Sequence, residues 1–221
     1  MVNGAKMSSE FLDKIEDDLK ISLFTDDDLK LIFRDKESSA IYNSLTYHLK
    51  LKNLERFKRG LYALTPRRKE KYTFSKFKLA NKLVLHSFIS FESALSHHNL
   101  IPETVHETTS STNSKNVMFE NSFGKFSFSY SPIEPFYLGV EKDEACDAKV
   151  ANPIRALFDI IYVRKKCYTK ILDLEQDLRI DLFELKKILS HFKASDILEL
   201  GEAYKKKTTR NFAKLLIKEL M

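Results

Sequence analysis

The chain has 221 residues, 43% of them hydrophobic and 12% aromatic, which excludes wholesale disorder and provides enough apolar material for one large or two small domains. No apolar run reaches the roughly 18–20 residues of a membrane span, no secretion signal is present and only two cysteines occur, so we expect a cytoplasmic protein without membrane contact. Basic residues outnumber acidic ones by 37 to 31, and residues 34–82 carry a net charge of +10, whereas residues 1–33 carry −4 and residues 83–221 are balanced.

Two short helices are expected at the start of the chain. Apolar residues at helical spacing predict the first over residues 8–23. Thr25 followed by three aspartates is a typical start for a second helix, whose buried face would hold Leu29, Ile32 and Phe33.

A third helix is expected over residues 38–52, with Ser38 or Ser39 as its cap. Its apolar side holds Leu45 and His48 together with neighbouring aliphatic residues. The opposite side is polar and almost free of acids. Such a surface suits contact with base edges and phosphates, since an ordinary solvent-facing helix usually mixes Glu among its lysines.

A basic hairpin follows over residues 54–64, where the sequence alternates with a period of two and turns at Gly60. Helices followed by a polar helix and a basic hairpin form the element order of a winged helix-turn-helix, in which the third helix enters the major groove. A helical domain with a solvated, Lys-rich surface is the alternative that this pattern leaves open. The expected DNA contacts are Lys36, Ser39, Asn43, Thr46, Tyr47, Lys50, Arg56, Lys58 and Arg59.

The remaining sequence divides the chain further. Residues 1–66 are the expected DNA-binding domain, residues 67–82 a linker and connecting helix, and residues 83–221 an α+β domain. In this domain Ser90 would cap a helix over 92–99, and residues 103–150 predict about four to six short antiparallel strands. Helices are then expected over 154–166, 181–191, 194–204 and 211–220, the first of them started by Asn152 and Pro153. The fold class predicted for the chain is α+β, with a small antiparallel sheet and C-terminal helices.

Polar residues of this domain do not form a recognisable catalytic or metal site. His97 and His98 would point about 100° apart on one helix, so we expect one to pack half-buried and the other to face solvent. The side chains of residues 90–93 match a hydrolytic set with His97 only by coincidence of spacing. Asp159, inside an apolar helix, is expected to be a structural hydrogen-bond partner. The lysine run 205–207 would be solvated, or would contact nucleic acid or a protein partner. We therefore predict no enzymatic activity, no cofactor and no metal.

Three separated blocks carry a family resemblance. They are R-G-L-Y-A-L at 59–64, F-I-S-F-E-S-A-L-S-H-H-N-L-I-P at 88–102 and A-N-P-I-R-A-L-F-D-I-I-Y at 151–162. In order and content they resemble the AbiEi family, the antitoxins of bacterial abortive-infection toxin–antitoxin pairs, which have an R-G-x-Y wing, a Y-I-S-x-x-S-A-L-x-x-H-G-L-I-P block and a Pro-x-[RK]-A-L-x-D helix. Asn99 stands where the family usually has Gly, and Asn tolerates the left-handed conformation that a helix end needs there.

The resemblance implies a two-part protein. Its N-terminal winged helix would bind double-stranded operator DNA as a monomer or weak dimer and repress its own operon. Its C-terminal domain would counter a cognate nucleotidyltransferase-type toxin without a stable complex. Two alternatives stay open: a protein-interaction module that neutralises the toxin by direct binding with no sequence-specific DNA role, and an enzyme acting on RNA or nucleotides.

Overall fold

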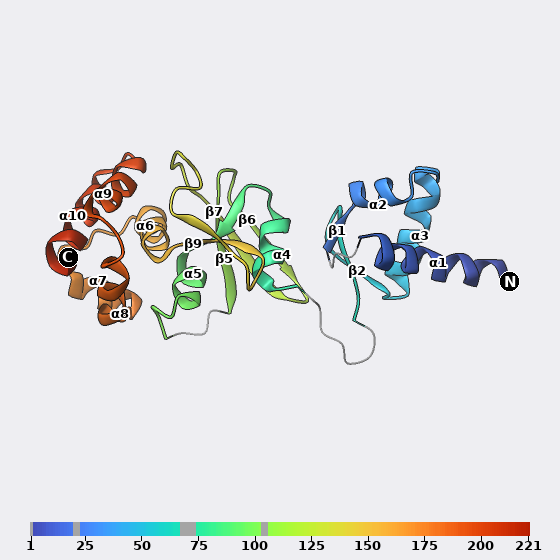
Figure 1. Ribbon diagram of the computed structural model, residues 1–221, viewed down its shortest axis with the longest axis horizontal. Coiled ribbons are helices and arrows are strands. Elements are labelled where there is room, and N and C mark those ends of the chain that lie inside the picture. Colours follow the sequence, from blue (N-terminus) through green and yellow to red (C-terminus); the bar gives the residue numbers. More distant parts are fainter. Residues whose placement is uncertain (1, 20–22, 67–73, 103–105) are drawn as a thin grey trace. The chain divides into compact units, whose positions relative to one another are not determined.

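The computed structural model describes residues 2–19, 23–66, 74–102 and 106–221 (Figure 1). It divides into two compact units, Met1–Ser75 and Lys76–Met221. Both units combine helices with strands, so the mixed helix-and-strand class predicted from the sequence is confirmed. The predicted linker residues 67–71 lie outside the described residues.

The first unit places three helices on a three-stranded antiparallel sheet of order β1-β3-β2. The strand β1 was not predicted from the sequence. Its residue Leu23 pairs with Ala63 of β3, so the expectation that Leu23 belongs to the first helix is wrong. The elements are α1 (Val2–Leu19), β1 (Leu23–Thr25), α2 (Asp26–Ile32), α3 (Ser38–Lys50), β2 (Leu54–Lys58) and β3 (Leu61–Leu64).

Local sequence signals start α2 but not α3. Thr25 is the N-cap of α2: its hydroxyl accepts from Asp28 N at 3.3 Å, and Asp28 Oδ2 accepts from Thr25 N at 2.7 Å. The expected serine cap of α3 is wrong, because Glu37 is its N-cap residue and Ser38 is already helical. A serine inside the first turn cannot accept the N–H bonds that a cap residue accepts.

Aromatic stacking joins the three helices of this unit. The Phe11 ring of α1 stacks on Phe33, which follows α2, at 4.7 Å between centroids and on His48 of α3 at 5.4 Å. His48 is 1% exposed, and Ile41 and Leu45 are buried on the same side of α3. The predicted apolar side of this helix is therefore confirmed, and its polar side is left facing outward.

The second unit contains a six-stranded sheet of order β6-β7-β5-β4-β9-β8. The expected small antiparallel sheet is wrong, because β5 runs parallel to β7 and β4 runs parallel to β9. Its strands are β4 (Ser87–Ile89), β5 (Glu107–Thr112), β6 (Val117–Asn121), β7 (Gly124–Tyr130), β8 (Val140–Asp143) and β9 (Ala148–Ala151).

Helices complete the second unit, and α7 to α10 gather beyond α6, on the side away from the sheet (Figure 1). The helix α7 was not predicted from the sequence, and α4 was expected in the connecting segment, whereas it packs against β4 and β9. The helices are α4 (Lys76–Leu83), α5 (Phe91–His97), α6 (Pro153–Arg164), α7 (Ile171–Leu178), α8 (Leu182–Leu189), α9 (Ala194–Ala203) and α10 (Lys207–Leu220). Across the described ranges, none of these helices or those of the first unit has the length and apolar character needed to cross a bilayer.

Candidate nucleic-acid interface

The outward side of α3 is an exposed polar stripe. Ser39, Asn43, Thr46 and Lys50 follow one another at helical spacing and are all exposed, and α3 contains no Asp or Glu. Two more of the expected contacts, Lys36 and Tyr47, are exposed beside this stripe. Lys36 Nζ lies 5.7 Å from the centre of the Phe33 ring, and Tyr47 is 48% exposed, with its ring nearly perpendicular to that of His48.

The hairpin β2–β3 departs from the simple alternation that its sequence suggests. A bulge between Arg56 and Lys58 turns Phe57 into the core, where its ring meets Phe74 edge-on at 5.8 Å. Arg56 and Arg59 are exposed, whereas Lys58 is half-buried. Burial lowers the pKa of the Lys58 ammonium. The hairpin thus presents two solvated guanidinium groups and one partly desolvated amine.

A hollow of about 670 Å³ lies between α3 and the hairpin. Four of the nine expected contacts line it: Thr46 from the helix, and Arg56, Lys58 and Arg59 from the hairpin. The other five lie on α3 or just before it, outside this lining. Helix and hairpin residues that are far apart in the sequence therefore share one concave surface.

Asp26 also lines this hollow, and the sequence analysis gave it only a role in starting α2. Burial, and after it the negative charge of the Asp26 carboxylate, raises the pKa of the Tyr62 hydroxyl. Gly60, at φ +78°, lies directly above: a Cβ there would come within 3.2 Å of Asp26 Oδ2. The hairpin turn is thus held close to the start of α2, and its positive φ and close approach explain why a glycine stands at position 60.

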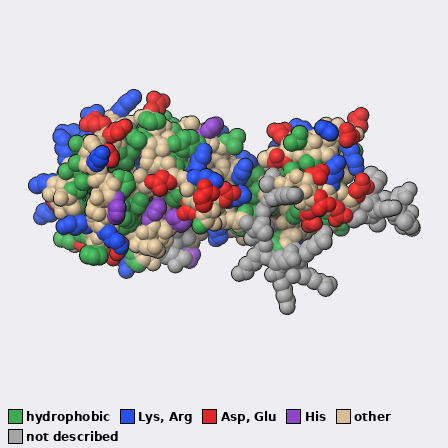
Figure 2. Space-filling view, viewed as in Figure 1, with side chains coloured by type: hydrophobic (Ala, Val, Ile, Leu, Met, Phe, Trp, Pro, Cys, Tyr) green, Lys and Arg blue, Asp and Glu red, His purple; other side chains and the backbone are tan. Residues whose placement is uncertain are grey.

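The basic stretch 34–82 is divided between the two units. Lys76, Lys78 and Lys82 lie on α4 of the second unit, and Lys78 Nζ pairs with Asp147 Oδ2 at 2.7 Å. Figure 2 shows acidic side chains among the basic ones on the visible face of each unit. The positive charge of residues 34–82 is therefore not gathered onto the first unit alone, as the sequence count had suggested.

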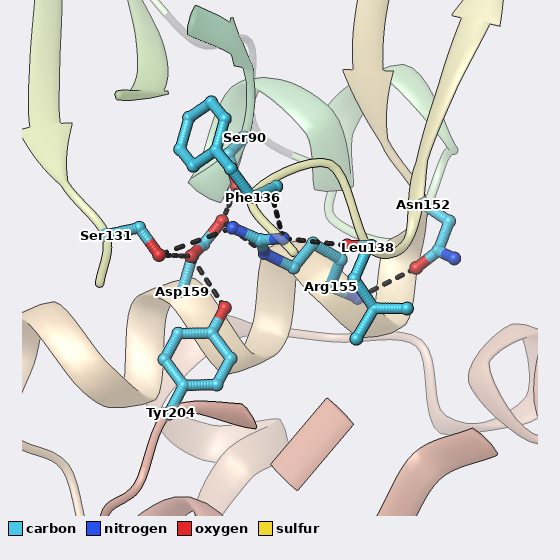
Figure 3. A network of polar contacts seen from close by, with 8 residues as sticks. All are labelled: Ser90, Ser131, Phe136, Leu138, Asn152, Arg155, Asp159 and Tyr204. Atoms are coloured by element: carbon cyan, nitrogen blue, oxygen red, sulfur yellow. Dashed lines mark hydrogen bonds and ion pairs between the residues drawn. The ribbon is translucent and has the colours of Figure 1, made fainter. Parts of the chain in front are cut away.

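A buried polar network occupies the centre of the second unit (Figure 3). Arg155 and Asp159 on α6 are both 0% exposed, and Arg155 Nε donates to Asp159 Oδ2 at 3.2 Å. Three hydroxyl groups from other segments donate to the same carboxylate: Ser90 at 2.7 Å, Ser131 at 3.1 Å and Tyr204 at 2.7 Å. Asp159 is therefore the structural hydrogen-bond partner that the sequence predicted.

The guanidinium of Arg155 is equally well satisfied. Its Nη1 donates to the carbonyls of Phe136 at 3.0 Å and Leu138 at 2.7 Å, and its Nη2 to Ser131 Oγ at 3.3 Å. The network joins the N-cap of α5, the segment after β7, α6 and the C-cap of α9, and burial raises the pKa of Tyr204 well above its usual value. These hydrogen bonds join distant segments of the unit through buried groups, so the arrangement fixes the fold.

The adjacent histidines of the second unit both have protein partners. His97 Nε2 lies 2.6 Å from Asp143 Oδ2, and His98 Nε2 lies 2.9 Å from the Ala151 carbonyl. The backbone N–H of Cys146, followed by His97, lowers the pKa of Asp143 to about 2. The expectation that one histidine faces solvent is wrong, because both are half-buried, and burial lowers the pKa of His98.

Residues 90–93 do not assemble a hydrolytic set with His97. Ser90 serves the Asp159 network, Glu92 pairs with Arg164, and Ser93 Oγ is bonded to Glu107 O and Thr109 N. Ser90 occupies the cap position of α5, but without the side-chain bond expected of it, because its hydroxyl is committed to Asp159. Within the described ranges, no group of three or more His, Cys, Asp or Glu side chains could hold a metal ion.

Comparison with known proteins assigns no family. No protein-family model and no curated protein matches the sequence. Among solved structures, the chain is similar to the RV2827C protein from Mycobacterium tuberculosis, with 13% identity, a TM-score of 0.49, and coverage of 93% of this chain and 80% of that one. Nothing about function follows from a similarity of this degree.

Proposed function

We propose that the chain is an antitoxin and autoregulatory repressor whose first unit is a winged helix-turn-helix that binds operator DNA. The observation that carries this proposal is the shared hollow: the acid-free stripe of α3 adjoins a concave surface lined by Thr46, Arg56, Lys58 and Arg59. In this arrangement Asn43 and Thr46 reach base edges in the major groove, while the hairpin arginines contact phosphates. The antitoxin role, directed against a nucleotidyltransferase-type toxin, rests on the AbiEi-like blocks.

DNA binding is tested by fluorescence anisotropy with the duplex upstream of the chain's own start codon, against a scrambled duplex at matched salt. If each protomer neutralises about five phosphates, log affinity falls against log salt with a slope of about −4 to −5. Equal affinity for both duplexes would overturn sequence-specific repression.

Variants separate the two kinds of contact. Arg56→Ala and Arg59→Ala should weaken binding to both duplexes and reduce the salt slope by about 1 each. Asn43→Ala should reduce discrimination between them by about 1–3 kcal/mol. The matched control is Lys30→Ala on α2, where the ammonium already pairs with Asp27 at 3.2 Å; it should leave affinity within about two-fold.

The antitoxin role is tested by co-expression with the toxin, which this proposal expects to be a nucleotidyltransferase encoded by a neighbouring gene. Restored growth that survives Asn43→Ala and Arg56→Ala would place neutralisation outside the DNA-binding surface. A stable complex with the toxin, combined with no operator preference, would instead favour the protein-interaction alternative.

A further inference from the structure

A second hollow, of about 500 Å³, lies in the second unit and is unrelated to the DNA-binding surface. We call it the tyrosine–lysine pocket. It is built where four segments meet: Asn116 before β6, Tyr130 at the end of β7, Tyr162 and Lys165 at the end of α6, and Lys206 at the start of α10. All of these residues are in or directly beside regular elements of one unit, so the pocket has ordered walls.

The charge of this pocket is of one sign. Lys165 and Lys206 line it and are exposed, and its described lining contains no Asp or Glu. Neither ammonium group forms an ion pair with any described carboxylate, and the nearby Glu202 is engaged by Arg210 Nε at 2.5 Å. No side chain caps the 14-residue helix α10, whose N-cap residue is Lys206, so its first N–H groups add to the positive potential. An anionic group is the ligand that this end of the pocket favours.

Two tyrosines also line the pocket. Tyr130 is 45% exposed, and its backbone is fixed by Asn116 Oδ1, which accepts from Tyr130 N at 2.7 Å. Tyr162 is half-buried, and its ring packs against the buried Tyr204 ring with centroids 5.5 Å apart. A partly exposed tyrosine ring on an ordered strand end gives a flat ligand a stacking surface.

We propose that the tyrosine–lysine pocket binds a nucleoside phosphate, with the base stacked on Tyr130 and the phosphate between Lys165 and Lys206. Stacking on aromatic side chains beside lysine-bound phosphates is the chemistry by which proteins hold unpaired nucleotides. The volume lies in the range of small-ligand pockets. It is too small for duplex DNA. The nucleotide has two sources, free in solution or at the end of a single-stranded RNA.

Isothermal titration of the full chain tests the proposal with each of the four ribonucleoside monophosphates, the matching nucleosides, inorganic phosphate and a short single-stranded RNA. At least one monophosphate, or the RNA, should bind about ten-fold or more tightly than the nucleosides and than phosphate alone. Binding of the monophosphate assigns a free nucleotide, and binding of the RNA alone assigns an RNA end. Absence of binding by all of them at millimolar concentration overturns the proposal.

Variants tie any binding to this pocket. Lys206→Ala and Tyr130→Ala should each weaken it about ten-fold, the first through the phosphate and the second through the base. The matched control is Lys207→Ala, which removes the same charge from the neighbouring exposed position outside the lining and should change affinity less than two-fold. Thermal unfolding midpoints should be unchanged, because the removed side chains are exposed. Equal effects of Lys206→Ala and Lys207→Ala would show that binding depends on general positive charge and not on this pocket, and would overturn the proposed site.

Discussion

The guanidinium of Arg155 is buried together with the carboxylate of Asp159, and each forms several hydrogen bonds with protein groups. Removing one member of such a pair leaves the other charge without compensation, which typically costs about 3–5 kcal/mol. We expect Arg155→Met to lower the free energy of unfolding of the second unit by this amount, measured by urea unfolding followed by circular dichroism. The double variant Arg155→Met/Asp159→Asn should regain part of the loss, because no buried charge is left.

Arg164 supplies the matched control for this prediction. It lies on the same helix and pairs with Glu92, but its side chain is 43% exposed. An exposed pair contributes about 0–1 kcal/mol, so Arg164→Met should have a small effect. Equal losses for the two arginine variants would contradict the importance assigned to the buried network.

At single positions, the sequence was informative wherever the signal is local. Thr25 with Asp28, Asn152 before Pro153, and the left-handed Asn99 at φ +58° are all as predicted, because a cap or a helix end involves residues within four positions. The hydroxyl partners of Asp159 could not be predicted from such local signals. Ser90, Ser131 and Tyr204 come from three distant segments, and only the fold brings them to one carboxylate.

Between elements, the close contact of α9 with α10 depends on Gly201. This residue does not have a positive φ, so it is the small size of glycine that matters here. A Cβ on Gly201 would lie 2.8 Å from Ala213 Cβ and 3.1 Å from Thr209 O. Helix propensity alone favours Gly201→Ala by about 1 kcal/mol, but overpacking costs about 1–3 kcal/mol. Because backbone and a packed Cβ cannot move away cheaply, we expect Gly201→Ala to destabilise the second unit in urea unfolding.

The companion variant Gly201→Ala/Ala213→Gly removes the closest of these contacts. It should recover part of the stability lost in the single variant. If Gly201→Ala were as stable as the wild type, the two helices could move apart without a loss in the free energy of unfolding, which would contradict this prediction.

The same dependence on distant partners limited the prediction of elements. Alternation in residues 103–150 identifies strands, but the alternation of a strand is the same whether its neighbour runs parallel or antiparallel. The parallel pairing of β5 with β7 was therefore not predicted. The three residues of β1 are too few for a period, and only pairing with β3 makes them a strand. For the candidate interface, the periodicity of α3 correctly gave its exposed side, whereas the bulge that buries Phe57 follows from packing against Phe74.

For the whole molecule, the position of α4 decides where the chain can be divided. Leu79, Ala80 and Leu83 are at most 1% exposed, and α4 packs against β4, β5 and β9, so the helix belongs to the core of the second unit.

A fragment of residues 76–221 should therefore unfold at the same urea concentration as the sheet does in the full chain. A fragment of residues 83–221, cut at the boundary expected from the sequence, loses the burial of Leu79 and Ala80 and uncovers the strands beneath them. At about 1.5–3 kcal/mol for a fully buried leucine, plus the newly exposed sheet surface, it should unfold at clearly lower urea. Hydrogen exchange of the β4 and β9 amides distinguishes the two fragments, and equal protection in both would mean that α4 is only a connector.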